Sequence, residues 1–504
     1  MRLNHHIVIA LSVLLSFSCN QKAKIEVVTE LTETQEAVTK ADTPTVLEGE
    51  FDFSVRDKDI WAYIERQKDF PRVLSIEPRV REGDTLMFIA NLEQGWRIFS
   101  ADKHLPPVLA EIPEGTFNQK LLDNSGLRLW MKSIMDLTCK IKQQKDLSTA
   151  TDYTDLWAGY PVLKKEEGKT RGVQGLSMDP TWTRVTINQQ TSYQVVDTQS
   201  PLLETKWGQG YPWNLRLPMH YTLNHYPTGC VAVAVSQLLY YYHNAINCPS
   251  GLYHGIAIDD WILHPANGNE QPYYTSSLSR TDYQNPSSRW GQMVKDYSAY
   301  ISNYPSSIAG ASYVSDLMVD VGNRSNMKYY ADASDSGSTI EDAQLAMSSY
   351  GLSSTHITFN EPYAYSNIVN NKPLYIRGTD TGGENNIGHA WVIDGAQKYQ
   401  FVNYNTYQWW MGYLVGSLPN GEEMTLEEAR QAAWEIGLDK PEDGMITHGY
   451  TYSTDCYYRF HMNWGYDGQS DGYYYLTDSV MFGEDYYSFI VDLEMLSNIH
   501  VSQN

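Results

Sequence analysis

An almost uninterrupted apolar run, Val231–Tyr240, follows a loop that contains Pro227 and Gly229. A run of this length with so few polar residues predicts a helix that is buried on most of its surface. Thr228 suits the N-cap position, where its hydroxyl would accept from N–H groups of the first turn, so Cys230 would begin the helix. The helix dipole there would lower the pKa of a thiol and favour a nucleophilic thiolate. The alternative is that Cys230 is a small core residue, since free cysteine is among the most buried residue types.

Length and charge limit the class of protein. A chain of 504 residues is too long for one hydrophobic core and predicts about two or three domains. An apolar content of 42% and an aromatic content of 13% are typical of a globular protein. The formal net charge of −23 argues against nucleic acid as a partner, because phosphates require a basic face. It also argues against non-specific attachment to anionic lipid.

The cysteines do not predict a disulfide-built scaffold, because five are too few. A helix from Cys230 to Cys248 would hold these two thiols roughly 27 Å apart, which is too far for a bond. A disulfide between Cys248 and Cys456 stays open.

The N-terminal residues are typical of an export signal. The apolar run Ile7–Phe17 is too short to span a bilayer and ends at Ser18-Cys19. It resembles a bacterial lipoprotein signal, which implies residues 1–18 as signal peptide and Cys19 as the lipidation site. The protein is then expected at the outer membrane or cell surface, with release to the extracellular space after processing. Ordinary cleavage near Ser18 and free secretion is the alternative. Residues 19–50 have no lasting period and predict a flexible tether.

Residues 51–160 are expected to form a small α+β unit without a catalytic cluster. Its predicted elements are helices over 59–68 and 121–141, strands over 85–90 and 96–100, and an extended segment over 104–109. Residues 161–190 are charged and contain glycines, which indicates a linker. Exposed links of this kind are where proteases cut, so a maturation site is predicted there.

Residues 191–504 are expected to form a second, larger α+β domain, with helices first and strands afterwards. Its predicted helices cover 290–303, 312–321 and 340–350, and its predicted strands cover 372–377, 389–394, 457–464 and 472–476. The long 399–457 connection includes a further predicted helix over 426–436, because Thr425 and Glu428 have capping-box spacing. We interpret this connection as surface decoration and not as a cover for a cleft.

Three separated positions supply the groups that a thiol protease requires. Cys230 is followed far along the chain by His389, and later by Asn463 beside Trp464. Thiol-dependent hydrolysis needs a thiolate, an imidazole that takes and returns protons, and a polar group that orients the imidazole. Each residue alone also has a structural explanation. Their distances along the chain prove little, because the contacts would be spatial.

Metal and nucleotide sites are not expected. The glycine-rich segment 378–387 leads into a strand instead of a helix, which argues against a phosphate-binding loop. No second His or Cys stands near His389 at zinc-ligand spacing. Segment 467–472 lacks the ligand pattern of an EF-hand and is predicted to be a turn. We therefore expect no cofactor and no metal.

The segments around these residues resemble the motifs of the streptopain family of papain-like cysteine proteases. The matching segments are 228–232, 388–395, 463–465 and 470–472. Segments 88–91, 95–103 and 105–109 are similar to the inhibitory propeptide of that family. The resemblance implies a papain-like α+β fold, in which a helical part carries the cysteine and an antiparallel sheet carries the histidine and Asn-Trp, preceded by a small α+β prodomain.

The resemblance also implies roles for individual residues. Cys230 would be the nucleophile, His389 the general base, and Asn463 with Trp464 the orienting and shielding residues. The chain would be the zymogen of a cysteine endopeptidase. Its partners would be protein or peptide substrates, together with its own propeptide as an intramolecular inhibitor.

Further residues around the cleft follow from the same resemblance. Ser336 and Gly337 lie in a stretch similar to one that helps to wall the family's cleft. The family can place a glutamine where this chain has Arg377. The oxyanion hole would then use the Cys230 N–H, with Gln209 or Arg377 as the side-chain donor.

Two other functions share these residues. One is a non-catalytic surface lipoprotein that binds peptide or protein on the same scaffold. The other is a thiol acyltransferase, which would use the same set of reactive groups.

Overall fold

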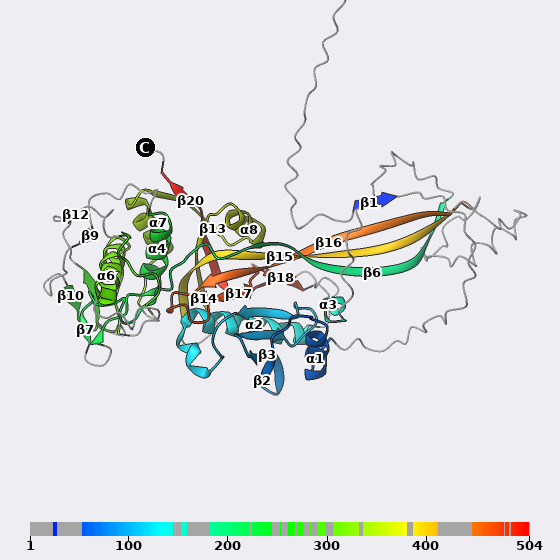
Figure 1. Ribbon diagram of the computed structural model, residues 1–504, viewed down its shortest axis with the longest axis horizontal. Helices are drawn as coiled ribbons and strands as arrows, with labels where there is room; N and C mark the ends of the chain where they lie inside the picture. Colours follow the sequence, from blue (N-terminus) through cyan, green and yellow to red (C-terminus); the bar gives the residue numbers. More distant parts are fainter. Residues whose placement is uncertain are drawn as a thin grey trace, which may run out of the picture. The chain divides into compact units, whose positions relative to one another are not determined.

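The computed structural model (Figure 1) describes the chain in segments. The described residues are 24–27, 53–144, 147, 153–158, 182–220, 224–243, 252–253, 261–267, 270–276, 283–284, 290–297, 306–331, 336–380, 387–411, 446–477, 479–482 and 485–502. They belong to two compact units. The smaller unit holds the described residues of 24–27, 182–194, 400–411 and 446–456, and the larger unit holds the rest.

The smaller unit is built from strands in its described part. Strand β1 (Lys24–Val27) runs antiparallel to β16 (Ile446–Asn463), and β6 (Trp182–Gln199) pairs with β15 (Ile387–Met411). The four residues of β1 fall within the segment predicted to be a flexible tether. Cys456 is disulfide-bonded. Cys19, Cys248 and the predicted helix over 426–436 lie outside the described residues.

One mainly antiparallel sheet organises the larger unit, in the order β13-β20-β14-β15-β16-β17-β5-β4-β3-β2. Its N-terminal strands are β2 (Val73–Arg81), β3 (Asp84–Leu92), β4 (Trp96–Ser100) and β5 (Val108–Ile112). The other strands that belong wholly to this unit are β13 (Leu352–Thr358), β14 (Leu374–Asp380), β17 (Gly472–Tyr475) and β20 (Val491–Val501). Strand β5 pairs with β17. The sheet of the N-terminal residues is therefore continuous with the sheet of the C-terminal residues.

The N-terminal part has the predicted α+β composition. Its helices are α1 (Asp57–Glu65), the 3-10 helix η1 (Gln119–Asp123), α2 (Ser125–Gln143) and α3 (Thr154–Ala158). Helix α2 begins later than predicted because Asn124 caps it, with its side chain accepting from the Leu127 N–H. The apolar residues at three- and four-residue spacing on α2, from Leu127 to Ile141, are buried, and the helix packs on β3.

Helix α4 (Cys230–Tyr241) lies at the centre of the helical part. Its residues from Val231 to Tyr240 are all buried, as the apolar run predicts. It packs against α6 (Ser306–Arg324) and α7 (Ile340–Ser349), which Figure 1 shows beside it. Helix α8 (Glu361–Val369) contacts β14 and β20. The helices predicted over 312–321 and 340–350 are confirmed.

Two local predictions are wrong. Residues Gly291–Tyr297 form turns and bends instead of a helix. The carbonyls of Val294 and Lys295 accept from the Trp207 indole and the Lys206 N–H, so they are not available to a helical ladder. Thr228 is not the N-cap of α4, because Gly229 takes that position with φ of 81°.

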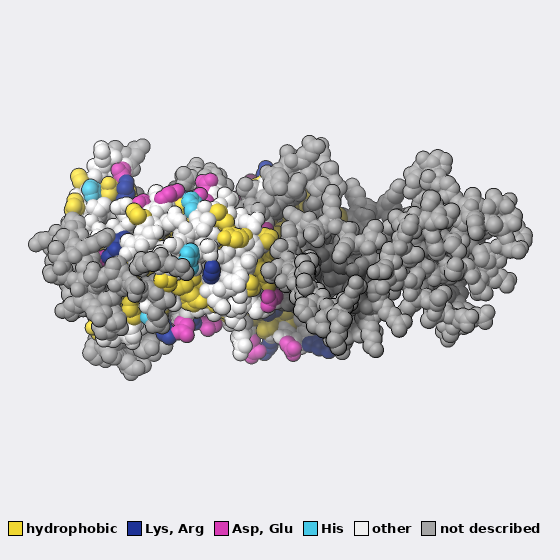
Figure 2. All heavy atoms as spheres, turned by 90° about the horizontal axis from the view of Figure 1, so that it is seen from above, with side chains coloured by type: hydrophobic (Ala, Val, Ile, Leu, Met, Phe, Trp, Pro, Cys, Tyr) yellow, Lys and Arg dark blue, Asp and Glu magenta, His cyan; other side chains and the backbone are white. Residues whose placement is uncertain are grey.

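Short strand pairs complete the described part of the fold. They are β7 (Met219–His220) with β8 (Asn224–His225), β9 (Leu252–Tyr253) with β12 (Tyr283–Gln284), β10 (Trp261–His264) with β11 (Tyr273–Ser276), and β18 (Ser479–Phe482) with β19 (Asp485–Ser488). Figure 2 shows acidic, basic and apolar side chains interspersed over the described part of one face. Among the helices that the structure describes, none has the length and apolarity to cross a bilayer.

Candidate active site

Cys230 is the first residue of α4, directly after a tight backbone turn at Gly229. A Cβ atom on Gly229 would lie 2.3 Å from the Met327 methyl group and 3.2 Å from the Ser336 carbonyl oxygen. The close approach and the positive φ both require glycine at this position. The backbone N–H and the hydroxyl of Thr228 instead donate to the Gln209 carbonyl oxygen, at 3.0 and 3.4 Å.

The thiol of Cys230 is not activated in this structure. Burial raises the pKa of the Cys230 thiol above its ordinary value, although the residue keeps partial exposure. The backbone N–H of Ala390, the first N–H groups of α4 and the charge of Arg377 act in the opposite direction. The predicted lowering of the pKa by the helix N-terminus is therefore outweighed by burial in this state of the protein.

His389 lies near the start of β15 and is 2% exposed. Its Nδ1 lies 2.9 Å from the Ser125 hydroxyl and its Nε2 lies 2.9 Å from the Trp464 carbonyl oxygen. Among the described residues no hydrogen bond joins the imidazole to Cys230. Burial lowers the pKa of His389 to about 4, and the charge of Arg128 acts in the same direction. The imidazole is therefore neutral at pH 7.

Ser125 and Gly126 at the start of α2 occupy the space beside His389. A Cβ atom on Gly126 would lie 2.4 Å from His389 Cδ2 and 2.4 Å from Trp464 Cε3. The Ser125 hydroxyl also lies 3.2 Å from the hydroxyl of Tyr466. The sequence analysis found no functional residue here. The only local signal is an N-cap asparagine followed by two small residues, which is also typical of an ordinary helix start.

Asn463 does not contact the imidazole in this structure. Its Oδ1 accepts from the Gln237 side chain at 2.9 Å and from the Gly465 N–H at 3.3 Å. Its Nδ2 donates to the Thr205 carbonyl oxygen at 2.8 Å, and the Thr205 hydroxyl donates to Gln237. This buried network ties α4 to the end of β16 and to the segment that precedes the cysteine loop.

The Trp464 carbonyl lies within hydrogen-bond distance of the imidazole, and its ring lies beside the imidazole at a tilt. The indole is 1% exposed, and its ring centroid lies 6.2 Å from that of His389. The Trp464 N–H donates to Asp471 Oδ1 at 3.0 Å. Burial raises the pKa of Asp471 to about 7. The sequence analysis placed Asp471 in a turn and in a segment that resembles a family motif, without assigning it a role.

The two candidate oxyanion donors differ in their surroundings. Gln209 is 4% exposed, and its side-chain oxygen and nitrogen have no hydrogen-bond partner among the described residues. Arg377 forms an ion pair of 3.5 Å with Glu494. A buried amide without a partner is costly, which marks Gln209 as a group that a ligand would satisfy.

The backbone of Ser336 lies against the cysteine loop, and Gly337 follows it in the chain. The Ser336 hydroxyl accepts from the Tyr330 N–H at 2.8 Å and donates to the Tyr330 carbonyl at 3.1 Å. Gly337 forms a β-bridge with Lys328. These bonds fix the loop whose Ser336 carbonyl approaches Gly229.

Further contacts hold the N-terminal part over the His389 side of the site. The Trp130 indole donates to the Tyr475 carbonyl at 2.8 Å, and Lys132 pairs with Asp380 at 3.0 Å. Glu111 on β5 lies 3.3 Å from Arg459 on β16. Together with the β5–β17 pairing, these contacts cover the imidazole with residues that precede the predicted linker.

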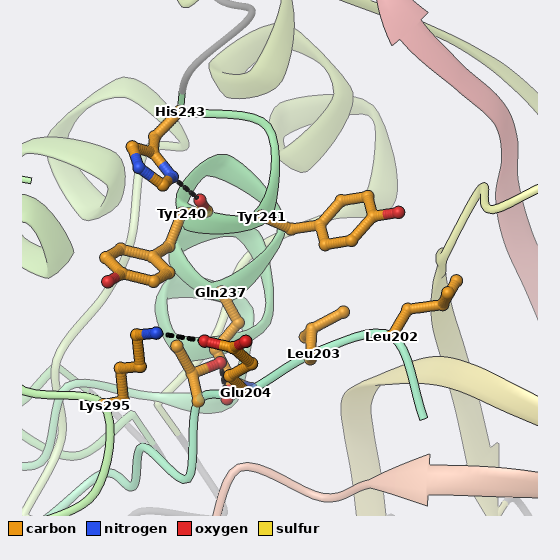
Figure 3. Close-up of a pocket in the computed structure, with 9 residues that line it drawn as sticks. Leu202, Leu203, Glu204, Gln237, Tyr240, Tyr241, His243 and Lys295 are labelled. Carbon is orange, nitrogen blue, oxygen red and sulfur yellow. Dashed lines mark hydrogen bonds and ion pairs between the residues drawn. The ribbon is translucent and has the colours of Figure 1, made fainter. Parts of the chain in front are cut away.

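A separate pocket of about 310 Å³ lies beside α4 (Figure 3). Its lining residues are Leu202, Leu203, Glu204, Thr205, Gln237, Tyr240, Tyr241, His243 and Lys295. Neither Cys230 nor His389 lines it, so it is not the catalytic cleft. It shares Thr205 and Gln237 with the buried network of Asn463. Within the described residues, no group of three or more His, Cys, Asp or Glu could hold a metal ion.

Comparisons with known proteins agree with these observations. Residues 207–474 match the model of the Peptidase C10 family. Streptopain of Streptococcus pyogenes is 25% identical over 346 residues, which cover 63% of this chain and 70% of that protein.

Among solved structures, a prointerpain A fragment of Prevotella intermedia has 21% sequence identity and a TM-score of 0.47, over 85% of this chain and 100% of that chain. Active interpain A cysteine protease of the same organism has 22% identity and a TM-score of 0.36, over 60% of this chain and 95% of that chain.

Proposed function

This chain belongs to the Peptidase C10 family and is a cysteine endopeptidase with an α+β papain-like fold, and from that premise we propose that Cys230 is its nucleophile and His389 its general base. His389 takes the proton of the Cys230 thiol, the sulfur attacks the scissile carbonyl carbon, and His389 passes that proton to the leaving amine as the C–N bond breaks. Water that His389 deprotonates then hydrolyses the thioester and restores the thiol.

The contact between α4 and β15 carries this assignment. Cys230 packs against the core cluster that contains Ala390, and Ala390 directly follows His389 in the chain. The thiol therefore lies near the strand that carries the imidazole. His389 must exchange its present contacts with Ser125 and the Trp464 carbonyl before it can act on the thiol.

The oxyanion of the tetrahedral intermediate is assigned to the Cys230 N–H and the Gln209 amide. Gln209 lies beside the cysteine loop, since its carbonyl accepts from Thr228. Its buried amide has no partner among the described residues, so it is available to a developing negative charge.

The residues that precede the predicted linker act as an inhibitory propeptide in this proposal. Ser125 bonds the imidazole that the thiol needs, and burial raises the pKa of Cys230 while it lowers that of His389. Both shifts favour a neutral, unreactive pair. A covalently linked inhibitor of this kind acts at an effective concentration that can reach about millimolar.

The nucleophile assignment is tested by Cys230→Ala, with Cys139→Ala as the matched control because Cys139 is a free cysteine on α2. Casein cleavage after a cut in the linker should be lost in Cys230→Ala and kept in Cys139→Ala. An epoxide inhibitor of thiol proteases should label the Cys230 peptide. Retained cleavage by Cys230→Ala would show that another residue is the nucleophile. Inhibitor labelling without hydrolysis would favour an acyltransferase.

Export and lipid attachment at Cys19 form a further part of the proposal, supported by the signal-like sequence of residues 1–18. The protease is placed at the outer membrane or cell surface and is released after processing. A fatty-acid analogue should label the wild-type protein and not Cys19→Ala. An unlabelled wild-type protein that is found in the medium would instead mean simple secretion.

A further inference from the structure

Arg377 lies in the sheet beside the reactive thiol. On β14 it is paired with Ala390 of β15 on one side and with Glu494 of β20 on the other. Ala390 belongs to the core cluster against which Cys230 packs. Arg377 is therefore one strand away from a residue of the cluster that Cys230 packs against.

The side chain of Arg377 belongs to the face of β14 that meets α4. Tyr375, two residues earlier and so on the same face, belongs to the core cluster that includes α4 residues, as do Ala390 and Val392. The charge of Arg377 also acts on the Cys230 thiol. A peptide whose scissile bond reaches Cys230 must pass close to this guanidinium.

Most of the hydrogen-bonding capacity of Arg377 is unused. A guanidinium has five N–H donors, yet the one contact that the described residues give it is the 3.5 Å ion pair with Glu494. Its side chain is 32% exposed. Glu494, in contrast, has a partner at each of its two carboxylate oxygens. One carboxylate oxygen accepts from His356 at 3.0 Å and the other faces Arg377.

We propose that Arg377 is a specificity-determining residue that binds the carboxylate of an aspartate or glutamate side chain in the peptide substrate, near the scissile bond. The inference rests on the proposed function and names a substrate class for it. A basic substrate side chain would compete with Arg377 and His356 for the Glu494 carboxylate, which both residues already contact. An acidic side chain meets a cation with open donors, and it can bind the planar guanidinium through both oxygens.

The test uses the processed enzyme and a peptide library in which glutamate and glutamine alternate at each position around the cleavage site. The wild type should prefer glutamate at one position by roughly ten- to hundred-fold in kcat/KM, the range expected for a charge-assisted hydrogen bond. Arg377→Gln should remove this preference by slowing only the glutamate peptides. Arg377→Lys should keep part of it. Glu494→Gln, which frees the guanidinium, should lower KM for glutamate peptides.

Two results would overturn the inference while the proposed function stands. One is a wild-type enzyme without acidic preference at any position. The other is an equal fall in kcat for glutamate and glutamine peptides in Arg377→Gln, which would make Arg377 an oxyanion donor. Labelling of Cys230 by the epoxide inhibitor shows that each variant is folded. If the wild type hydrolyses no peptide, the proposed function fails and the inference falls with it.

Discussion

The imidazole of His389 is bound at both nitrogens, and neither partner is the thiol. Ser125 holds Nδ1 and the Trp464 carbonyl holds Nε2. An imidazole in this position cannot take the proton of Cys230. In the proposed zymogen, two small residues of α2 would account for latency by holding the proposed base away from the thiol.

Gly126→Ala is expected to release the block. The added methyl group would lie 2.4 Å from atoms of both His389 and Trp464, so the start of α2 must move away from the imidazole. The uncut precursor should then react faster with the epoxide inhibitor. Lys140→Ala, an exposed change on the same helix, is the control. Equal labelling rates for the wild type and both variants would contradict the role of this contact.

At the scale of elements, the buried hydrogen-bond network of Asn463 joins three separate segments of the chain. Gln237 comes from α4, Asn463 from β16, and Thr205 from the segment before the cysteine loop. The network sets how helix α4, which begins at Cys230, and the Trp464 carbonyl that meets the imidazole lie relative to each other. Asn463 would act as a positioning residue in this form.

Asn463→Ala distinguishes this role from direct orientation of the imidazole. Loss of the network leaves Gln237 unsatisfied and should lower the free energy of unfolding by about 1–3 kcal/mol, measured by denaturant titration. The pH dependence of kcat should stay unchanged if Trp464 alone orients His389. A shifted pH profile in the processed variant would mean that Asn463 contacts the imidazole after activation.

The sequence predicted those parts of the site whose pattern lies in one continuous stretch of residues. The α4 run and the strands that carry His389 and Asn463 were recognised because their patterns are continuous along the chain. The contact between Ser125 and His389 joins residues 264 positions apart, and no local pattern predicts it. The prediction of Thr228 as the N-cap is wrong for a similar reason. Met327 and Ser336, which are distant in the chain, decide the conformation of Gly229.

At the scale of the whole larger unit, acid should weaken the docking of the propeptide residues. Docked His389 has a pKa of about 4 instead of about 6.5, so docking favours the neutral imidazole. That stabilisation is present above the ordinary pKa of about 6.5 and is lost as the pH falls toward 4. Among the described residues, the charge of Arg128 acts on this imidazole and the ring of Tyr466 lies 5.8 Å from it, centroid to centroid.

Glu111 acts in the same direction at lower pH. Burial opposes its ionisation, but the charges of Arg459 and Arg97 outweigh burial and hold the pKa of Glu111 below its usual 4.5. Its contribution to docking is present above that pH and is lost as the pH falls through the lowered value. The reaction rate of uncut precursor with the epoxide inhibitor, corrected for that of the cut enzyme, should rise between pH 6.5 and 4. A flat ratio would contradict this linkage.

The pairing of β5 with β17 has a consequence for the time course of activation. A cut in the linker breaks one covalent bond, yet it leaves this strand pair and the Lys132–Asp380 and Glu111–Arg459 contacts in place. The cleaved N-terminal fragment must still dissociate from β17 before the His389 side chain can change its contacts. Activity should therefore appear after a lag. Because a fragment that has left can return only by diffusion, the final activity should rise on dilution and fall when the mixture is concentrated.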